Sequence, residues 1–200
     1  MIRIEGLTKH YGRVVALDGL NLHVPRGELF CFLGPNGAGK TTTIKILTGL
    51  LRPTAGRAEI GGVDISADPV AAKRKIGYIP DMPYLYDRLT PVEYLRFVAD
   101  LYGIPPRVAA ERTGGLLKLF GLEEQGGSLI RNLSHGMRQR LLYCANLLHE
   151  PEVLFIDEPL IGLDPYTIRL IKNLLKARSR AGMTIFLTTH ILAQVSQFHS

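Results

Sequence analysis

The sequence predicts an α/β fold in which helices flank a mostly parallel sheet, preceded by an antiparallel β part. Short apolar runs alternate with helical patterns along the chain, which is the order of elements in a parallel sheet joined by helices. Two runs, LFCFL at 29–33 and VLFI at 153–156, are apolar at every position, which is typical of central strands buried on both faces. The pair Gly61-Gly62 between short strands indicates the antiparallel first part.

The strands are predicted at the apolar runs 2–4, 20–24, 29–33, 76–79, 153–156 and 184–187. The helices are predicted at 41–50, 91–102, 134–149 and 165–180, because Pro, Ser or Gly stands at their ends. A further helical pattern at 108–120 carries Gly114 and Gly115 at its centre. Since each Gly destabilises a helix by about 1 kcal/mol relative to Ala, we expect a break or a flexible turn there.

The length and composition are those of one globular domain. The chain has 200 residues, of which 46% are hydrophobic and 21% charged, so wholesale disorder is excluded. The net charge of +6 is spread evenly, with 13 basic against 10 acidic residues in the first hundred and 11 against 8 in the second. This distribution argues against a basic nucleic-acid-binding tail.

Neither a membrane span nor a secretion signal is predicted. The start, MIRIEGLTKHYG, lacks the apolar core of a signal peptide, and no apolar stretch approaches the length of a span. Cys31 and Cys144 both lie in apolar surroundings without a CxxC pair, so we expect two reduced thiols rather than a disulfide or a metal site. We therefore expect a soluble cytosolic chain that needs a partner for any work at a membrane.

A phosphate-binding loop is predicted at 34–41, where GPNGAGKT follows an apolar run and precedes a helical one. The pattern is G-x-x-x-x-G-K-[ST] in the strand–loop–helix context of a P-loop NTPase. Gly34, Gly37 and Gly39 let the backbone N–H groups approach phosphates closely. A Gly-rich turn that binds nothing is the alternative, but the flanking elements make it the weaker interpretation.

The residues after the glycines have distinct predicted roles in that loop. Lys40 would reach the β- and γ-phosphates, the Thr41 hydroxyl would ligate Mg²⁺, and Thr42 would help to hold the α- and β-phosphates. The predicted nucleotide-binding residues of this segment are Gly34, Pro35, Asn36, Gly37, Ala38, Gly39, Lys40, Thr41 and Thr42.

Two acids end the second apolar run, in VLFIDEP at 153–159. Carboxylates at the end of a buried strand are unfavourable unless they have cationic partners. Asp157 is predicted to complete the Mg²⁺ site that Thr41 begins, and Glu158 to activate the attacking water as general base. An acidic helix start is the alternative, and the preceding phosphate loop argues against it.

Two further segments bear on the kind of NTPase. LSHGMRQR at 133–140 places Ser134 at a helix start with Gly136 behind it, where a phosphate could bind. The phosphate loop already supplies the binding groups for the nucleotide at Lys40. No second phosphate within one chain is therefore evident that would bind at Ser134 and Gly136. His190 ends TTH after a strand, where a lone His is more often structural than catalytic.

With these segments in this order, the chain resembles the ATP-binding subunit of an ABC transporter over essentially its whole length. Residues 34–41 match Walker A, 153–158 match Walker B, Leu133–Met137 occupy the place of the LSGGQ signature, and Gly162-Leu163-Asp164 match the D-loop. The resemblance implies that Tyr11 stacks on adenine. It also implies that His190 contacts the γ-phosphate, so that Glu158, His190 and Lys40 are the catalytic residues.

The resemblance further implies how such a chain assembles. Two domains pair head to tail, and each ATP lies between the Walker motifs of one and Ser134 and Gly136 of the other. The implied partners are a membrane permease and a second ATP-binding subunit, with no specific nucleic acid, at the cytoplasmic face of the membrane. The implied domain spans 1–200, with a helical subdomain at about 85–135.

The sequence departs from the family pattern in three places. Asp81 stands where the family has the Q-loop glutamine; its carboxylate could reach Mg²⁺ or water but adds negative charge, or it could only shape a turn. His135 and Met137 replace Gly and Gln of the signature, and His135 would either make that contact pH-sensitive or be a simple surface substitution. The sequence ends ten residues after His190, where family domains usually continue with two further strands, so we expect a truncated or otherwise covered sheet edge.

The leading hypothesis is an ATPase that drives transport of an unknown substrate through a permease. In this hypothesis, the aromatic and apolar segment 84–94 contacts the membrane partner; the alternative is that these side chains are simply part of the core. A soluble cassette ATPase acting on nucleic acid or ribosomes, and a nucleotide-binding module with weak turnover, are the alternatives.

Overall fold

The computed structural model describes residues 1–82, 84–159 and 163–191. The chain divides into two compact units. The first unit comprises Met1–Asp81, Pro151–Leu160 and Lys172–Ser200, and the second comprises Met82–Glu150 and Ile161–Ile171.

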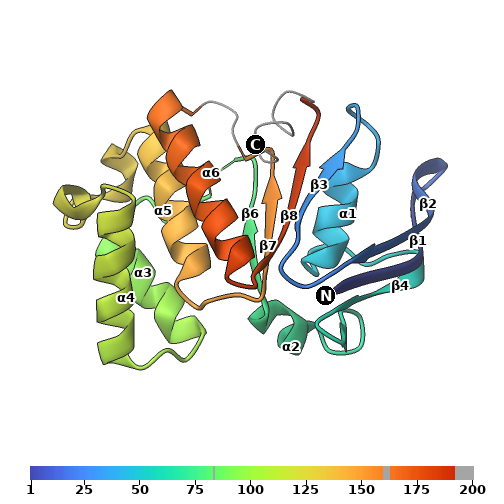
Figure 1. The fold of residues 1–200 in the computed structure, drawn as a ribbon, viewed down its shortest axis with the longest axis horizontal. Coiled ribbons are helices and arrows are strands. Elements are labelled where there is room, and N and C mark those ends of the chain that lie inside the picture. The colour runs from blue at the N-terminus through green and yellow to red at the C-terminus, as the bar shows by residue number, and fades with distance from the viewer. Residues whose placement is uncertain (83, 160–162, 192–200) are drawn as a thin grey trace. The chain divides into compact units, whose positions relative to one another are not determined.

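The first unit contains a parallel sheet with the strand order β3-β8-β7-β6 (Figure 1). Its strands are β3 (Leu29–Leu33), β6 (Ile76–Ile79), β7 (Val153–Asp157) and β8 (Thr184–Thr189). Every residue of β7 and β8 is buried. The prediction that VLFI is a central, doubly buried strand is therefore confirmed.

The same prediction for LFCFL is wrong, because β3 lies at an edge of this sheet and its residues are half-buried or exposed. Phe30 and Phe32 pack on the core beside Phe186, with ring centroids 5.3 and 5.6 Å from that ring. On the other face, Leu33 is 42% exposed. An uninterrupted apolar run therefore marks a strand without settling its place in the sheet.

An antiparallel sheet with the order β2-β1-β4-β5 forms the rest of the first unit's β structure. Its strands are β1 (Ile2–Tyr11), β2 (Val14–Val24), β4 (Ala55–Ile60) and β5 (Val63–Asp64). Gly61 and Gly62, with φ of 56° and 77°, form the tight turn between β4 and β5, so the antiparallel prediction is confirmed. Short strands on either side of these glycines were predicted, but without bounds, since AGRAEI is not an apolar run.

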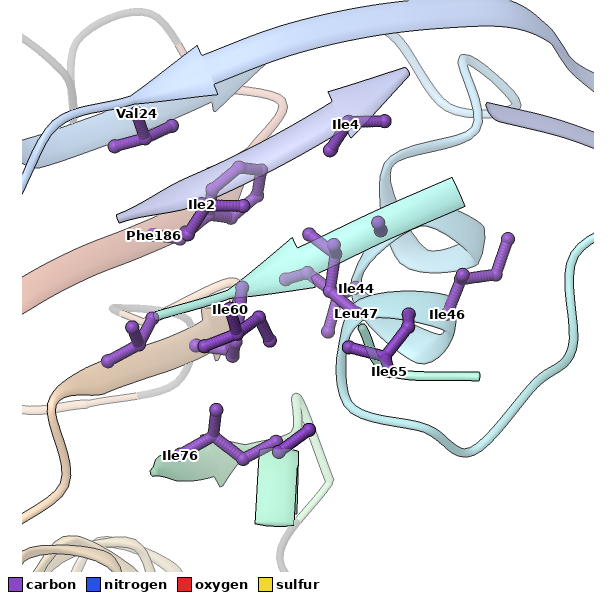
Figure 2. Packing of buried hydrophobic residues seen from close by; sticks show 14 of the residues in the cluster. Ile2, Ile4, Val24, Ile44, Ile46, Leu47, Ile60, Ile65, Ile76 and Phe186 are labelled. Carbon is purple, nitrogen blue, oxygen red and sulfur yellow. The ribbon is translucent and has the colours of Figure 1, made fainter. Parts of the chain in front are cut away.

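Helices α1 (Lys40–Leu47) and α2 (Pro69–Arg74) complete the described part of this unit up to Asp81. Buried side chains from β1, β4, α1 and β8 form one core cluster. Figure 2 shows members of this cluster, among them Ile2, Ile60, Ile44 and Phe186. The cluster holds α1 against both sheets through Ile44, Ile46 and Leu47, and the position of this helix fixes the end of the loop before it.

The second unit is helical. It contains α3 (Pro91–Leu101), α4 (Pro106–Leu119) and α5 (His135–Leu147), with the 3₁₀ turns η1 (Glu123–Gln125) and η2 (Ile130–Asn132) (Figure 1). A capping box of Thr90 and Glu93 begins α3, and the Ser134 hydroxyl caps α5 by accepting a hydrogen bond from Met137 N.

The expected break at Gly114-Gly115 is wrong, because α4 runs through both glycines without interruption. The helix buries Ala109, Leu116 and Leu117 on one face, and this apolar contact outweighs a penalty of about 2 kcal/mol for two glycines.

Helix α6 (Pro165–Arg180) begins in the second unit and continues from Lys172 onward in the first. Near its end, the Ser179 hydroxyl donates to the carbonyl oxygen of Gly27 over 2.7 Å. Among the residues that the structure describes, no helix combines the length and apolarity needed to cross a bilayer. Cys31 and Cys144 are both free thiols, as expected, although Cys31 is only partly buried.

Candidate nucleotide-binding site

The phosphate loop links the end of β3 to the start of α1 and depends on its glycines. Gly37 and Gly39 have φ of 83° and 82°, in the left-handed region that glycine adopts without strain. A Cβ on Gly39 would lie 2.6 Å from both the Ala16 carbonyl oxygen and Leu17 Cδ2. Gly39 is therefore required twice, for its backbone conformation and for the close approach of β2.

Lys40 is the first residue of α1, and it is 7% exposed. Its Nζ donates to the carbonyl oxygens of Gly34 and Pro35 over 2.6 and 2.9 Å. An ammonium has three N–H donors, so these two bonds leave one for an anion in the loop. Thr41 is exposed and Thr42 half-buried in the same first turn, where the positive end of the helix dipole favours negative charge.

Asp157 ends β7 and is only 5% exposed. Its Oδ1 accepts a hydrogen bond from the Thr188 hydroxyl over 2.5 Å. This bond orients the carboxylate and leaves its other oxygen available to a cation.

Glu158 follows with φ of 52°, which is uncommon for a non-Gly residue and strains the backbone. Its Oε1 accepts a hydrogen bond from the His190 backbone N over 3.1 Å and lies 2.7 Å from His190 Nδ1. Its Oε2 is buried, without a hydrogen-bond partner in the described part of the chain. Since a buried carboxylate oxygen is normally hydrogen-bonded, Oε2 is a suitable acceptor for a water molecule.

The end of β8 joins these groups. Thr188 holds Asp157, the Thr189 carbonyl oxygen accepts from Gly34 N over 3.3 Å, and His190 holds Glu158. Gly34, Asp157, Glu158 and His190 thus meet at the carboxyl edge of the parallel sheet. Thr188 and Thr189 were not predicted as part of the site. Their position directly before His190 could have indicated that they lie at the same edge of the sheet.

Asp81 follows β6 at the same edge and is exposed. The pKa of Tyr78 is raised to about 12, mainly by burial, and the negative charges of Asp157 and Asp81 contribute to this rise. Both carboxylates are therefore near one side chain of β6.

Tyr11, at the end of β1, is 48% exposed. Lys9 Nζ lies 5.3 Å from its ring centroid, which is cation–π distance. The ring can stack on a flat ligand. Tyr11 stands directly before the turn from β1 into β2, and Ala16 and Leu17 of β2 lie close to Gly39.

The remaining predicted residues lie in the second unit. Ser134 is exposed at the start of α5, and the Cβ position of Gly136 is 3.8 Å from Asp164 Oδ2. Asp164 caps α6, because its carboxylate accepts from the backbone N and hydroxyl of Thr167 over 2.9 and 2.6 Å. These bonds hold the pKa of Asp164 below its ordinary value. Gly162 of the predicted D-loop lies outside the described residues.

A metal site made of protein side chains alone is not found in the described residues, which hold no group of three or more His, Cys, Asp or Glu with suitable placement. A cation at this edge would therefore depend on hydroxyl and phosphate oxygens in addition to Asp157.

Comparison with known proteins gives a consistent result. Residues 17–161 match the family profile described as ABC transporter. The chain is 38% identical over 197 residues to the Nod factor export ATP-binding protein I of Ralstonia nicotianae, a match that covers 98% of this chain and 61% of that protein. The chain thus spans about three fifths of the length of this curated relative.

Two solved structures share the fold. One, described as the ATP-binding subunit of an ABC transporter, is 36% identical with a TM-score of 0.92, and the match covers 98% of this chain and 82% of that one. The other, the dimeric ATP-binding cassette MJ0796 bound to ADP and Pi in a post-hydrolysis state, is 26% identical with a TM-score of 0.82, covering 96% and 89%. The resemblance inferred from the motifs is confirmed, and the chain belongs to the ABC transporter family of ATP-binding proteins.

Proposed function

We propose that this chain binds ATP with Mg²⁺ and hydrolyses it to drive a membrane transporter, as one of two ATP-binding subunits joined to a permease. One observation carries the proposal. The phosphate loop, Asp157, Glu158 and His190 are tied to the last residues of a single strand, β8, within one compact unit. We further propose that residues 1–200 act as one ATPase domain with a helical subdomain at about 85–135.

The phosphates would bind in the loop from Gly34 to Thr42. Lys40 supplies a fixed positive charge whose own position is set by two loop carbonyls. The N-terminus of α1 adds backbone N–H donors and the favourable end of the helix dipole. Tyr11 would stack on the base, since half of its surface is accessible.

Mg²⁺ fits this donor set. The Thr41 hydroxyl is exposed in the first turn of α1, and Asp157 offers one oxygen beyond the one that Thr188 holds. Hard oxygen ligands of this kind, few in number and supplemented by phosphate and water, are those that Mg²⁺ prefers. When bound, the ion would neutralise phosphate charge and favour bond cleavage. Asp81 is a further candidate ligand.

Hydrolysis requires a base for the attacking water. Glu158 Oε2 is buried and has no hydrogen-bond partner among the described residues, so it can accept a hydrogen bond from a water molecule, while His190 holds Oε1. As the water oxygen bonds to the γ-phosphorus, Oε2 takes a proton from that water, and the bond from phosphorus to the bridging oxygen of ADP breaks. His190 orients Glu158 and can also contact the γ-phosphate.

A second subunit would complete the site. Ser134 and Gly136 lie in the second unit at the start of α5, exposed or half-exposed. The Ser134 hydroxyl accepts from Met137 N but can still donate its own proton, and the start of a helix suits a phosphate. The similarity to a dimeric cassette bound to ADP and Pi supports this assignment. Asp164, next to Gly136, would lie at the same contact.

The helical unit offers a surface for the permease. Tyr84 and Tyr86 are 82% and 59% exposed. A cavity of about 560 Å³ lies between α3 and α4, lined by Val92, Arg96, Asp100, Pro106, Ala109, Ala110, Thr113, Gly114 and Leu117. Exposed aromatic groups and hollows in the surface are both typical of protein interfaces. This contact would hold the chain at the cytoplasmic face of the membrane, and the export function named for its relative supports a transport role.

The test is Glu158→Gln, measured as phosphate release and as binding of Mg-ATP by the purified chain together with its permease. The amide cannot accept the proton, so we expect turnover to fall at least about 100-fold while ATP stays bound and dimerisation increases. Glu28→Gln, an exposed carboxylate before β3 at the opposite edge of the sheet, is the matched control.

Unchanged turnover in Glu158→Gln would refute the assignment of the base. No hydrolysis by the unaltered complex would favour the module with weak turnover. Tight, salt-sensitive RNA binding without a co-purifying permease would favour the nucleic-acid alternative.

A further inference from the structure

Lys9 holds its ammonium against the ring of Tyr11, which comes two residues later in β1. Nζ lies over this ring, 5.3 Å from its centroid. The same Nζ donates a hydrogen bond to the carbonyl oxygen of Arg52 over 2.8 Å. Among the residues that the structure describes, no carboxylate forms an ion pair with Lys9, so the ring and this carbonyl are the groups that its charge contacts.

The carbonyl group that anchors Lys9 belongs to a segment, 52–54, that is fixed to the end of β1. His10 N donates to the Thr54 hydroxyl over 3.0 Å, and Thr54 N donates to the carbonyl oxygen of Thr8 over 2.8 Å. These two bonds involve the residues on either side of Lys9 in the chain. The anchor of the ammonium therefore keeps its place relative to β1 without any contribution from the Tyr11 ring.

This arrangement leaves the other face of the Tyr11 ring to a ligand. A cation at this distance is attracted to the face of an aromatic ring, so Lys9 occupies one face and restricts the rotation of the side chain. The ring is nevertheless 48% exposed. A planar base that stacks on the open face would meet a ring that is already oriented, and binding would then cost less side-chain freedom.

We infer that Lys9 is a positioning residue for the nucleobase: its ammonium fixes the plane of the Tyr11 ring on which the base of ATP stacks. Lys9 thereby sets the part of the affinity that comes from the base, and leaves the part that comes from the phosphates unchanged. The inference rests on the proposed function, because it concerns the same nucleotide. Lys9 acts through Tyr11 and needs no contact with the nucleotide itself.

The experiment compares the β,γ-imido analogue of ATP with inorganic tripolyphosphate, both with Mg²⁺, by titration calorimetry on the full chain. The readout is the ratio of the two dissociation constants, which measures the advantage that the nucleoside gives. Lys9→Met keeps the length of the side chain and removes its charge, whereas Lys9→Arg keeps the charge and an N–H donor. Lys45→Met removes an exposed lysine charge in the last turn of α1 and is the matched control.

We expect Lys9→Met to lower the advantage of the analogue about two- to fivefold, as for a cation–π contact at a partly exposed site, with unchanged affinity for tripolyphosphate. Lys9→Arg and Lys45→Met should preserve the advantage. In a Tyr11→Ala background, Lys9→Met should have no further effect, because the two residues act as one unit.

An unchanged advantage in Lys9→Met would overturn the inference, as would an effect that persists without the Tyr11 ring. Equal losses for both ligands would also overturn it, because Lys9 would then support the segment 52–54 or attract the phosphates. Equal binding of the two ligands by the unaltered chain would exclude stacking on Tyr11, and the inference with it, but not the phosphate site. If the unaltered chain bound neither ligand, the proposed function would fail as well.

Discussion

Two glycines of the phosphate loop share a backbone conformation but differ in their surroundings. Gly37 and Gly39 have φ of 83° and 82°. A Cβ on Gly37 would meet no atom within 4 Å, whereas a Cβ on Gly39 would lie 2.6 Å from the Ala16 carbonyl oxygen and from Leu17 Cδ2. Gly37→Ala and Gly39→Ala therefore form a matched pair in which only the available space differs.

The expected losses follow from this geometry. A left-handed backbone costs an alanine about 1–2 kcal/mol, and the lower entropy of the unfolded chain offsets about 0.4–1 kcal/mol of this in both variants. Gly37→Ala should therefore lower the free energy of unfolding by about 1 kcal/mol. Gly39→Ala must also displace a backbone oxygen of β2, which adds about 1–3 kcal/mol.

Urea unfolding followed by far-ultraviolet circular dichroism, without nucleotide, measures both losses on one scale. We expect Gly39→Ala to be about 2 kcal/mol less stable than Gly37→Ala, with the same dependence on urea concentration. Equal losses would refute the reasoning, because the contact with β2 would then have no energetic consequence.

Two other substitutions test the second unit. The Tyr143 hydroxyl is buried without a hydrogen-bond partner in the described residues, and its ring stacks on Phe120; Tyr143→Phe should raise the free energy of unfolding by about 1 kcal/mol in urea, and a loss of that size would contradict the prediction. The hydrogen bonds from Thr167 hold the pKa of Asp164 below its ordinary value, so its ionised form stabilises the fold above the ordinary pKa, and this contribution disappears as pH falls through the lowered pKa. The stability difference between the unaltered chain and Asp164→Asn should thus be constant above about pH 5 and change below about pH 4, whereas a difference independent of pH would refute the assignment.

The strand–helix alternation and the main motif positions were predictable from the sequence. The phosphate loop, the buried strand ending in Asp157 and the N-cap at Ser134 all depend on residues that are neighbours in the chain. Local patterns of this kind carry their own structural signal, because glycine conformation, apolar periodicity and capping act within a few residues.

The predictions from the sequence were wrong where contacts between residues far apart in the chain determine the structure. LFCFL is apolar because Phe30 and Phe32 pack beside Phe186, and its own residues could not reveal that it lies at an edge of the sheet. The continuity of α4 across Gly114 depends on the burial of Leu116 and Leu117, and this packing overrides a local propensity. The bounds of β4 could not be predicted either, because β4 forms by pairing with β1, a partner far away in the sequence.

The sequence by itself determined which groups could carry the chemistry: a lysine in a glycine loop, two acids after a buried strand and a histidine after another. Only the tertiary structure decided that the end of β8 and the residue after it connect them, with Thr188 on Asp157, the Thr189 carbonyl on Gly34 and His190 on Glu158. The physical reason is that strand order and register are set by long-range pairing and core packing. These interactions bring together residues 34, 157 and 190, which no local pattern relates.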